Sequence, residues 1–145
     1  MRRWIGALVL GLLACGAVAF AQQPITPAAS VTSSVYDGTT PLLPKFIQVN
    51  VSANGDNTLI TAVPSRKIRI LSALLVMEGT SSTLRFESGA GGDALTGRIG
   101  PLLGTPLVWP FNPIGWFETS SGSLLNLELG ATTDVDGSLV YVEVP

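Results

Sequence analysis

Carboxylates are the residues of this chain with the clearest capacity for chemistry, because the sequence contains no histidine. The usual general base, the usual zinc ligand and any Ser-His-Asp triad are therefore missing. Glycoside hydrolysis needs only two carboxylates at a set separation in a cleft. Five glutamates are of the right type for it: Glu78, Glu87, Glu118, Glu128 and Glu143. Most of them alternate with apolar residues, which is typical of the solvated face of a strand. We expect no enzyme, no cofactor and no small-molecule substrate.

An acidic segment near the C-terminus could bind a metal ion. Asp134-Val135-Asp136-Gly137 matches part of a calcium-binding loop. The remaining ligands and the distal glutamate of an EF-hand are absent, and a hairpin turn explains the segment equally well. We therefore predict no metal ligand here.

Aromatic rings and prolines are concentrated in residues 107–119, LVWPFNPIGWFET. The candidates for interface contact or ligand stacking are Trp109, Phe111, Trp116 and Phe117. Rings of this kind can stack on sugars, or they can anchor a core or an interface. Pro110 and Pro113 exclude a helix and a long central strand. We expect two short strand ends joined by a rigid turn at residues 111–113, where the chain changes direction.

Alternation of apolar and polar residues predicts the elements that hold these side chains. Residues 45–53, the turn 54–57 and residues 58–63 together predict a β-hairpin. Residues 66–78 could form a helix with Ser65 as its N-cap, but their opening alternation favours a strand. Further strands are predicted at residues 82–87, 94–100, 123–129 and 138–144.

Turn signals recur throughout, and one of them, the glycine-rich stretch 88–92, lacks the lysine of a phosphate-binding loop. The spacing is typical of an all-β domain, an antiparallel β-sandwich that is jelly-roll-like and has about eight strands.

The N-terminus has the features of a targeting segment. Residues 1–21 begin with a basic pair, continue as an apolar run that predicts a signal-like helix, and end in Ala19-Phe20-Ala21. Cleavage before Gln22 is the first interpretation. The alternatives are a lipid on Cys15 or an uncleaved membrane anchor. We expect the protein to contact a membrane only in these two cases. Residues 22–44 are a Pro/Ser/Thr-rich arm or linker, and residues 45–145 form the sandwich.

Charge is scarce in this chain. Charged residues make up 12% of it, about half the usual share of ~25% in soluble domains. Without Arg2 and Arg3, six basic and ten acidic residues remain, which argues against nucleic-acid binding. Cys15 is the only cysteine, so the sandwich has no disulfide. Low charge suits a domain that buries its surface against copies of itself.

Several segments resemble the small jelly-roll-like structural domains of tailed-phage virion proteins, which are head decoration or tail-associated proteins. The matching stretches include KIRILSALLVMEG, TLRFESGAGGDALTG and NPIGWFETSSGSLLNLELG. The most specific parts are residues 113–119 and 137–144, and the resemblance covers residues 46–144. It implies a non-enzymatic, self-associating virion component, a homotrimer that contacts a capsid or tail lattice.

The signal-like segment departs from that pattern, because virion proteins are assembled in the cytoplasm. It admits a secreted or periplasmic location in place of the virion. The alternative function is a secreted β-sandwich module that binds carbohydrate or another surface.

Overall fold

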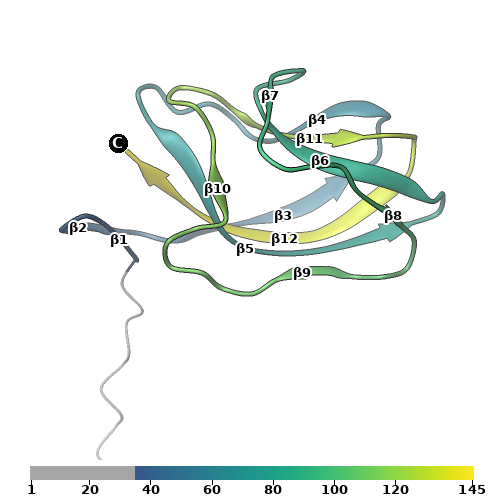
Figure 1. The fold of residues 1–145 in the computed structure, drawn as a ribbon, viewed down its shortest axis with the longest axis horizontal. Coiled ribbons are helices and arrows are strands. Elements are labelled where there is room, and N and C mark those ends of the chain that lie inside the picture. The colour runs from purple at the N-terminus through teal and green to yellow at the C-terminus, as the bar shows by residue number, and fades with distance from the viewer. Residues whose placement is uncertain (1–34) are drawn as a thin grey trace, which may run out of the picture. The chain divides into compact units, whose positions relative to one another are not determined.

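The computed structural model describes residues 35–145. The predicted signal-like helix at residues 1–21, Cys15, and residues 22–34 of the predicted arm lie outside the described residues. The described part folds into β-strands without a helix, as the all-β prediction required (Figure 1). Residues 35–145 accordingly include no helix long and apolar enough to span a membrane.

Two antiparallel sheets pack face to face. Sheet I has the order β10-β5-β12-β3, with β9 also paired to β5, and sheet II has the order β4-β11-β6-β7, with β8 also paired to β6. The strands of sheet I are β3 (Lys45–Val51), β5 (Lys67–Glu78), β9 (Leu107–Trp109), β10 (Phe117–Glu118) and β12 (Asp134–Val144). Those of sheet II are β4 (Gly55–Ile60), β6 (Ser82–Ser88), β7 (Asp93–Ala94), β8 (Ile99–Leu102) and β11 (Leu125–Leu129). The antiparallel sandwich prediction is confirmed at this level.

Residues 67–78 form strand β5, and the alternative of a helix is wrong. Ile68 and Ile70 point inward and are fully buried, as their period of two predicted. A register shift opposite Val140 and Tyr141 then changes the alternation, and Leu71 is buried on the outer face of sheet I.

The predicted hairpin at residues 45–63 is wrong. β3 pairs with β12 in sheet I, and β4 pairs with β11 in sheet II, so the turn between them crosses from one sheet to the other. Each strand has an apolar face and a polar face. A sandwich can bury two such faces against each other without pairing the strands.

The N-terminal arm contributes structure that its composition did not predict. β1 (Val35–Asp37) and β2 (Thr40–Leu42) form a separate two-stranded hairpin. Gly38 lies in its turn with φ 58°, a conformation that glycine adopts without strain. Val35 is fully buried against Leu71 and Val142, so the hairpin attaches to the outer face of sheet I.

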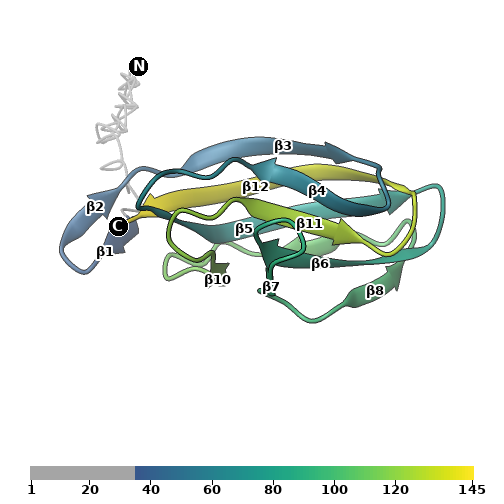
Figure 2. The same ribbon diagram turned by 90° about the horizontal axis from the view of Figure 1, so that it is seen from above.

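The two long sides of the sandwich differ. Figure 2 shows β3 and β4 along one side and β7, β8 and β10 along the other. On the second side each sheet ends in two short segments that pair with the same strand. In sheet I, β9 and β10 both pair with β5, and in sheet II, β7 and β8 both pair with β6. The first side ends in unbroken strands of seven and six residues.

Strand β12 begins earlier than predicted. Asp134, Asp136 and Gly137 belong to the strand and pair with Glu78, Val76 and Leu75 of β5. The hairpin turn that the sequence placed at this segment is therefore wrong, because backbone pairing on both sides of β12 extends the strand to Asp134.

Candidate functional site

The aromatic stretch interrupts an edge strand instead of turning a corner. β9 and β10 both run antiparallel to β5, with Trp109 opposite Ala73 and Phe117 opposite Ile70. The chain therefore keeps its direction, contrary to the prediction. Residues 110–116, here called the aromatic loop, bulge out between the two segments. Asn112 and Trp116 tie the loop to β5 by donating their backbone N–H groups to the carbonyls of Leu71 and Ile70.

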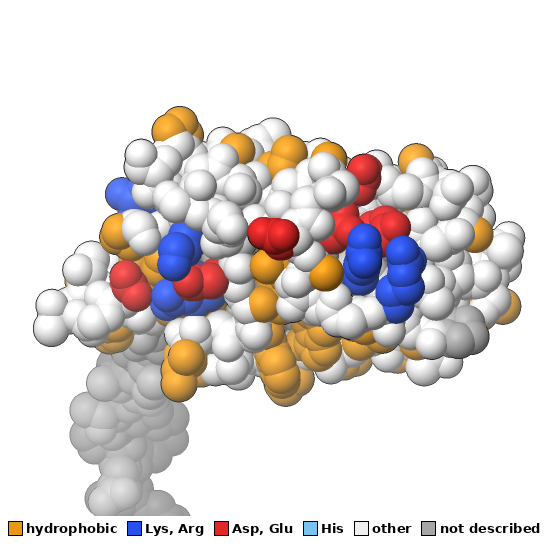
Figure 3. All heavy atoms as spheres, turned by 45° about the horizontal axis from the view of Figure 1, so that its top comes forward, with side chains coloured by type: hydrophobic (Ala, Val, Ile, Leu, Met, Phe, Trp, Pro, Cys, Tyr) orange, Lys and Arg blue, Asp and Glu red, His pale blue; other side chains and the backbone are white. Residues whose placement is uncertain are grey.

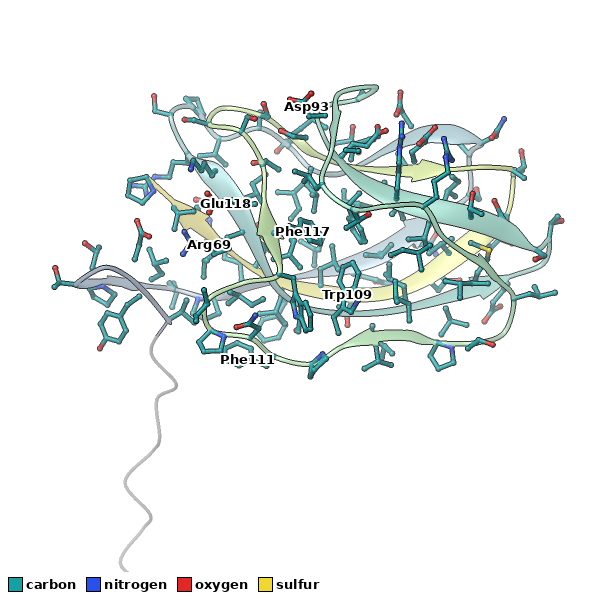
Figure 4. All side chains as sticks on the ribbon, in the orientation of Figure 1. Arg69, Asp93, Trp109, Phe111, Phe117 and Glu118 are labelled. Carbon is teal, nitrogen blue, oxygen red and sulfur yellow. The ribbon has the colours of Figure 1, made fainter. Side chains whose placement is uncertain are left out.

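Trp109 and Phe117 are partly buried and pack against the core. Both pack on Phe86 of the opposite sheet, with ring centroids 5.4 and 5.1 Å away. The two rings also meet edge to face at 5.5 Å, an arrangement favoured by the quadrupoles of the rings. In Figure 4 both side chains lie over the body of the sandwich. Of the candidate interface or stacking residues, these two mainly join the sheets.

Trp116 and Phe111 face the outside, each 45% exposed. Trp116 is fixed on one face by stacking on Trp109 at 6.0 Å and 26°. Its indole Nε1–H donates a hydrogen bond of 2.9 Å to the carbonyl oxygen of Pro110. These two contacts fix the orientation of the indole without a ligand, and they leave its other face uncovered by Trp109.

A cluster of paired charges lies beside the aromatic loop. Glu118 accepts hydrogen bonds from Lys67 Nζ at 2.7 Å and from Arg69 Nε at 3.0 Å. Arg69 Nη2 also reaches Asp37 Oδ1 at 3.3 Å, which links β5 to the β1–β2 hairpin. The hydrogen bond from Lys67 and the charge of Arg69 hold the pKa of Glu118 below its usual range. Figure 4 shows Arg69 and Glu118 next to each other.

The charged groups and the aromatic loop line an open groove of about 650 Å³. We call it the corner groove, and its lining includes Tyr36, Asp37, Arg69, Ile114, Trp116 and Glu118. Gly115 shapes it with φ 95°, and a Cβ atom there would lie 2.5 Å from Cγ of Arg69. The glycine thus lets the loop lie directly on the arginine stem. Sequence reasoning named Trp116 but missed Tyr36, Asp37 and Arg69, because they are distant along the chain.

A second polar cluster lies on the outer face of sheet II. Asn126 Nδ2 donates to Asp56 Oδ1 at 2.7 Å and to Glu87 Oε2 at 3.0 Å. Glu87 and Asn126 are fully buried although they point away from the core. The chain after β6 folds back, and Gly91 donates its N–H to Asp56. This covering segment explains why Glu87, although it lies on the outer face of the sheet, is not exposed to solvent as predicted for the glutamates.

The remaining glutamates are mostly paired with cations. Glu128 lies between Arg85 and Arg98, and Glu143 contacts Lys45. Figure 3 shows most of the visible basic and acidic side chains side by side in two separate groups. Among residues 35–145, no three His, Cys, Asp or Glu side chains gather in a way that could hold a metal ion.

Comparisons with known proteins do not assign this chain to a family. No family model matches the chain, and no curated protein matches its sequence. Among solved structures, one reported as a Bacillus endospore appendage, from a family of disulfide-linked pili, aligns with a TM-score of 0.45 at 9% identity. The alignment covers 71% of this chain and 87% of that chain. A similarity this low transfers neither fold nor function.

Proposed function

We propose that this protein is a non-enzymatic structural subunit that associates with copies of itself, and that association uses the side of the sandwich formed by β3. The single observation behind the proposal is the contrast between its two long sides. A strand edge exposes a row of backbone donors and acceptors that can pair with another chain, and monomeric proteins usually block such edges.

The side formed by β7 to β10 is blocked. Its strands are two to four residues long. Pro106, Pro110 and Pro113 stand beside or between them, and proline removes the backbone donor that a pairing strand would need. This side offers no continuous template for another strand.

The β3 side is open. Seven residues of β3 pair with β12 along one edge of the strand. Within residues 35–145, no strand pairs with the other edge of β3. The strand has no proline and no inward charge, and its one cation, Lys45, is bound to Glu143. Ile47 and Val51 pack on the core but stay partly exposed. An added strand would bury them further, and burial of apolar area favours association.

Exposed apolar side chains on the same sheet support the proposal. Phe46 of β3 is 76% exposed. Leu74 of β5 and Val108 of β9, which pair with each other, are also exposed on the outer face. The chain carries few charges to oppose the burial of this face.

The order of strands supports assignment of the sandwich to the jelly-roll class. From β3 to β6 each strand lies in the sheet opposite its predecessor, and the same holds for β11 and β12. Such alternation is how a jelly roll wraps two sheets from one chain. This class is frequent among self-assembling shells, which agrees with a structural role.

For the assembly itself we propose a tailed-phage particle, as a head decoration or tail-associated protein. The support is the sequence resemblance over residues 46–144. A secreted or periplasmic location is the alternative, supported by the signal-like residues 1–21. Genes for capsid, portal and tail proteins beside this gene would favour the virion, and their absence together with cleavage before Gln22 would favour export.

Light scattering on the full chain across micromolar concentrations tests self-association, with intact mass recorded to define the N-terminus. We expect a multimer. A trimer, as the resemblance implies, requires β3 to meet a different surface of the next copy, whereas β3 pairing with itself gives a two-fold dimer. A monomer at every concentration would refute the proposal.

A further inference from the structure

The corner groove has a rigid aromatic wall. Trp116 presents one ring face to it, because Trp109 covers the other face and Pro110 accepts the indole N–H. A ring that is already fixed loses little conformational freedom when a ligand stacks on it. Ile114, from the same loop, extends this wall.

A second part of the groove wall comes from the β1–β2 hairpin. Tyr36 is 50% exposed and lines the groove, while its neighbour Val35 is buried against sheet I and fixes the strand. Two aromatic side chains from segments far apart in sequence therefore line one open cleft. Its volume of about 650 Å³ falls in the range of about 300–1,000 Å³ typical of small-molecule sites.

The polar groups at the groove balance in charge. Asp37, Glu118 and Arg69 line the groove, and Lys67, which lies outside the lining, binds Glu118 and completes an ion-pair network of two acidic and two basic groups. An anionic ligand would meet two carboxylates, and a cationic ligand would have to displace bonds that already exist. Carboxylates keep spare lone pairs and guanidinium keeps spare N–H groups. A neutral ligand rich in hydroxyl groups can use both.

We propose that the corner groove binds a neutral oligosaccharide, whose ring faces stack on Trp116 and Tyr36. Its hydroxyl groups hydrogen-bond to Asp37, Arg69 and Glu118. The groove is open at the surface, so it accommodates a residue within a chain of sugars. The site lies apart from the β3 edge, and it would let an assembled subunit attach to a glycan-bearing surface.

The test is calorimetric titration of the full chain with neutral hexasaccharides of β-glucose, α-glucose, α-mannose and N-acetylglucosamine. Hexagalacturonate serves as the anionic comparison. We expect saturable binding of at least one neutral hexamer and weaker binding of the anionic one. Calorimetry is preferred to fluorescence because replacing Trp116 would itself alter the optical signal.

Variants connect binding to the groove. Trp116→Ala should weaken affinity at least tenfold, Trp116→Phe less, and Tyr36→Ser should weaken it from the hairpin part of the wall. Phe111→Ala is the matched control, since Phe111 is equally exposed in the same loop but does not line the groove. Circular dichroism should show each variant folded. The proposal is overturned if no neutral hexamer binds at millimolar concentration, if hexagalacturonate binds best, or if Phe111→Ala weakens binding while Trp116→Ala and Tyr36→Ser do not.

Discussion

Glu118 connects several parts of the molecule through its two carboxylate oxygens. One oxygen binds Lys67 and the other binds Arg69, which in turn reaches Asp37 on the hairpin. Arg69 is the most enclosed member, with its side chain 17% exposed. Exposed ion pairs contribute about 0–1 kcal/mol each. A shared network that includes a largely enclosed guanidinium should contribute more than a single surface pair.

Stability should therefore depend on the ionisation of Glu118. Its pKa is lowered in the folded state from an ordinary value of 4.5. The stabilisation is fully present above that value and is lost as pH falls through the lower folded-state pKa. Glu118→Gln should lower the melting temperature at pH 7, and the difference from the unaltered protein should shrink as pH falls below 4.5.

Thermal unfolding from pH 7 down to pH 2 measures this difference. Glu78→Gln is the matched control, because Glu78 is exposed and takes part in none of the ion pairs among residues 35–145. A difference for Glu118→Gln that stays constant with pH would contradict the assigned linkage.

The residue types predicted which side chains could take part in chemistry, but not which of them would contact each other in the fold. The glutamates were expected on a solvated face, yet Glu118 pairs across 49 and 51 residues of chain. Glu87 lies on the outer face as its alternation predicted, and is buried because the chain after β6 folds over it. Such contacts depend on how loops cross the sheets, which local periodicity does not encode.

At the scale of elements, β12 is held on both sides and depends on one glycine. Gly137 pairs with Leu75 of β5 and with Val49 of β3. Its φ is 153°, and a Cβ atom there would lie 1.9 Å from the carbonyl oxygen of Leu74. Because the obstacle is backbone, no rotation of a side chain relieves it.

Gly137→Ala should destabilise the protein by roughly 3 kcal/mol or more, since backbone strain and overpacking each cost about 1–3 kcal/mol. Urea unfolding measures the change. Gly97→Ala is the control, because a Cβ atom at Gly97 meets nothing within 4 Å. Equal stability of the two variants would show that β12 can shift to accept a side chain.

Strands were predicted wherever alternation was regular, as in β3, β5, β6 and β11. Of the short elements, the two strand ends that became β9 and β10 were expected, but the β1–β2 hairpin was not. The β1–β2 hairpin was missed because prolines dominated the interpretation of the arm, although Asp37-Gly38 is a recognised turn signal. The aromatic loop was expected to reverse the chain. Two hydrogen bonds to β5 instead keep both flanking segments on the same edge.

At the scale of the whole molecule, composition and turn spacing were sufficient to predict an antiparallel sandwich. They did not predict which strands pair. Sequence neighbours such as β3 and β4 satisfy the same alternation whether they share a sheet or face each other across the core. The contrast between a blocked and an open side follows only from the pairing.

Lysines on β3 should reveal whether that edge mediates association. In Gln48→Lys/Asn50→Lys, pairing of β3 with β3 of another copy would bring like charges together, so for that mode of association we expect light scattering to report a smaller species. High salt should restore the multimer, because screening weakens the repulsion. Ser138→Lys is the control: Ser138 pairs with Gln48 but lies on β12, one strand inside the edge. If Ser138→Lys dissociates the multimer and the β3 variant does not, copies meet through the face of sheet I and not through its edge.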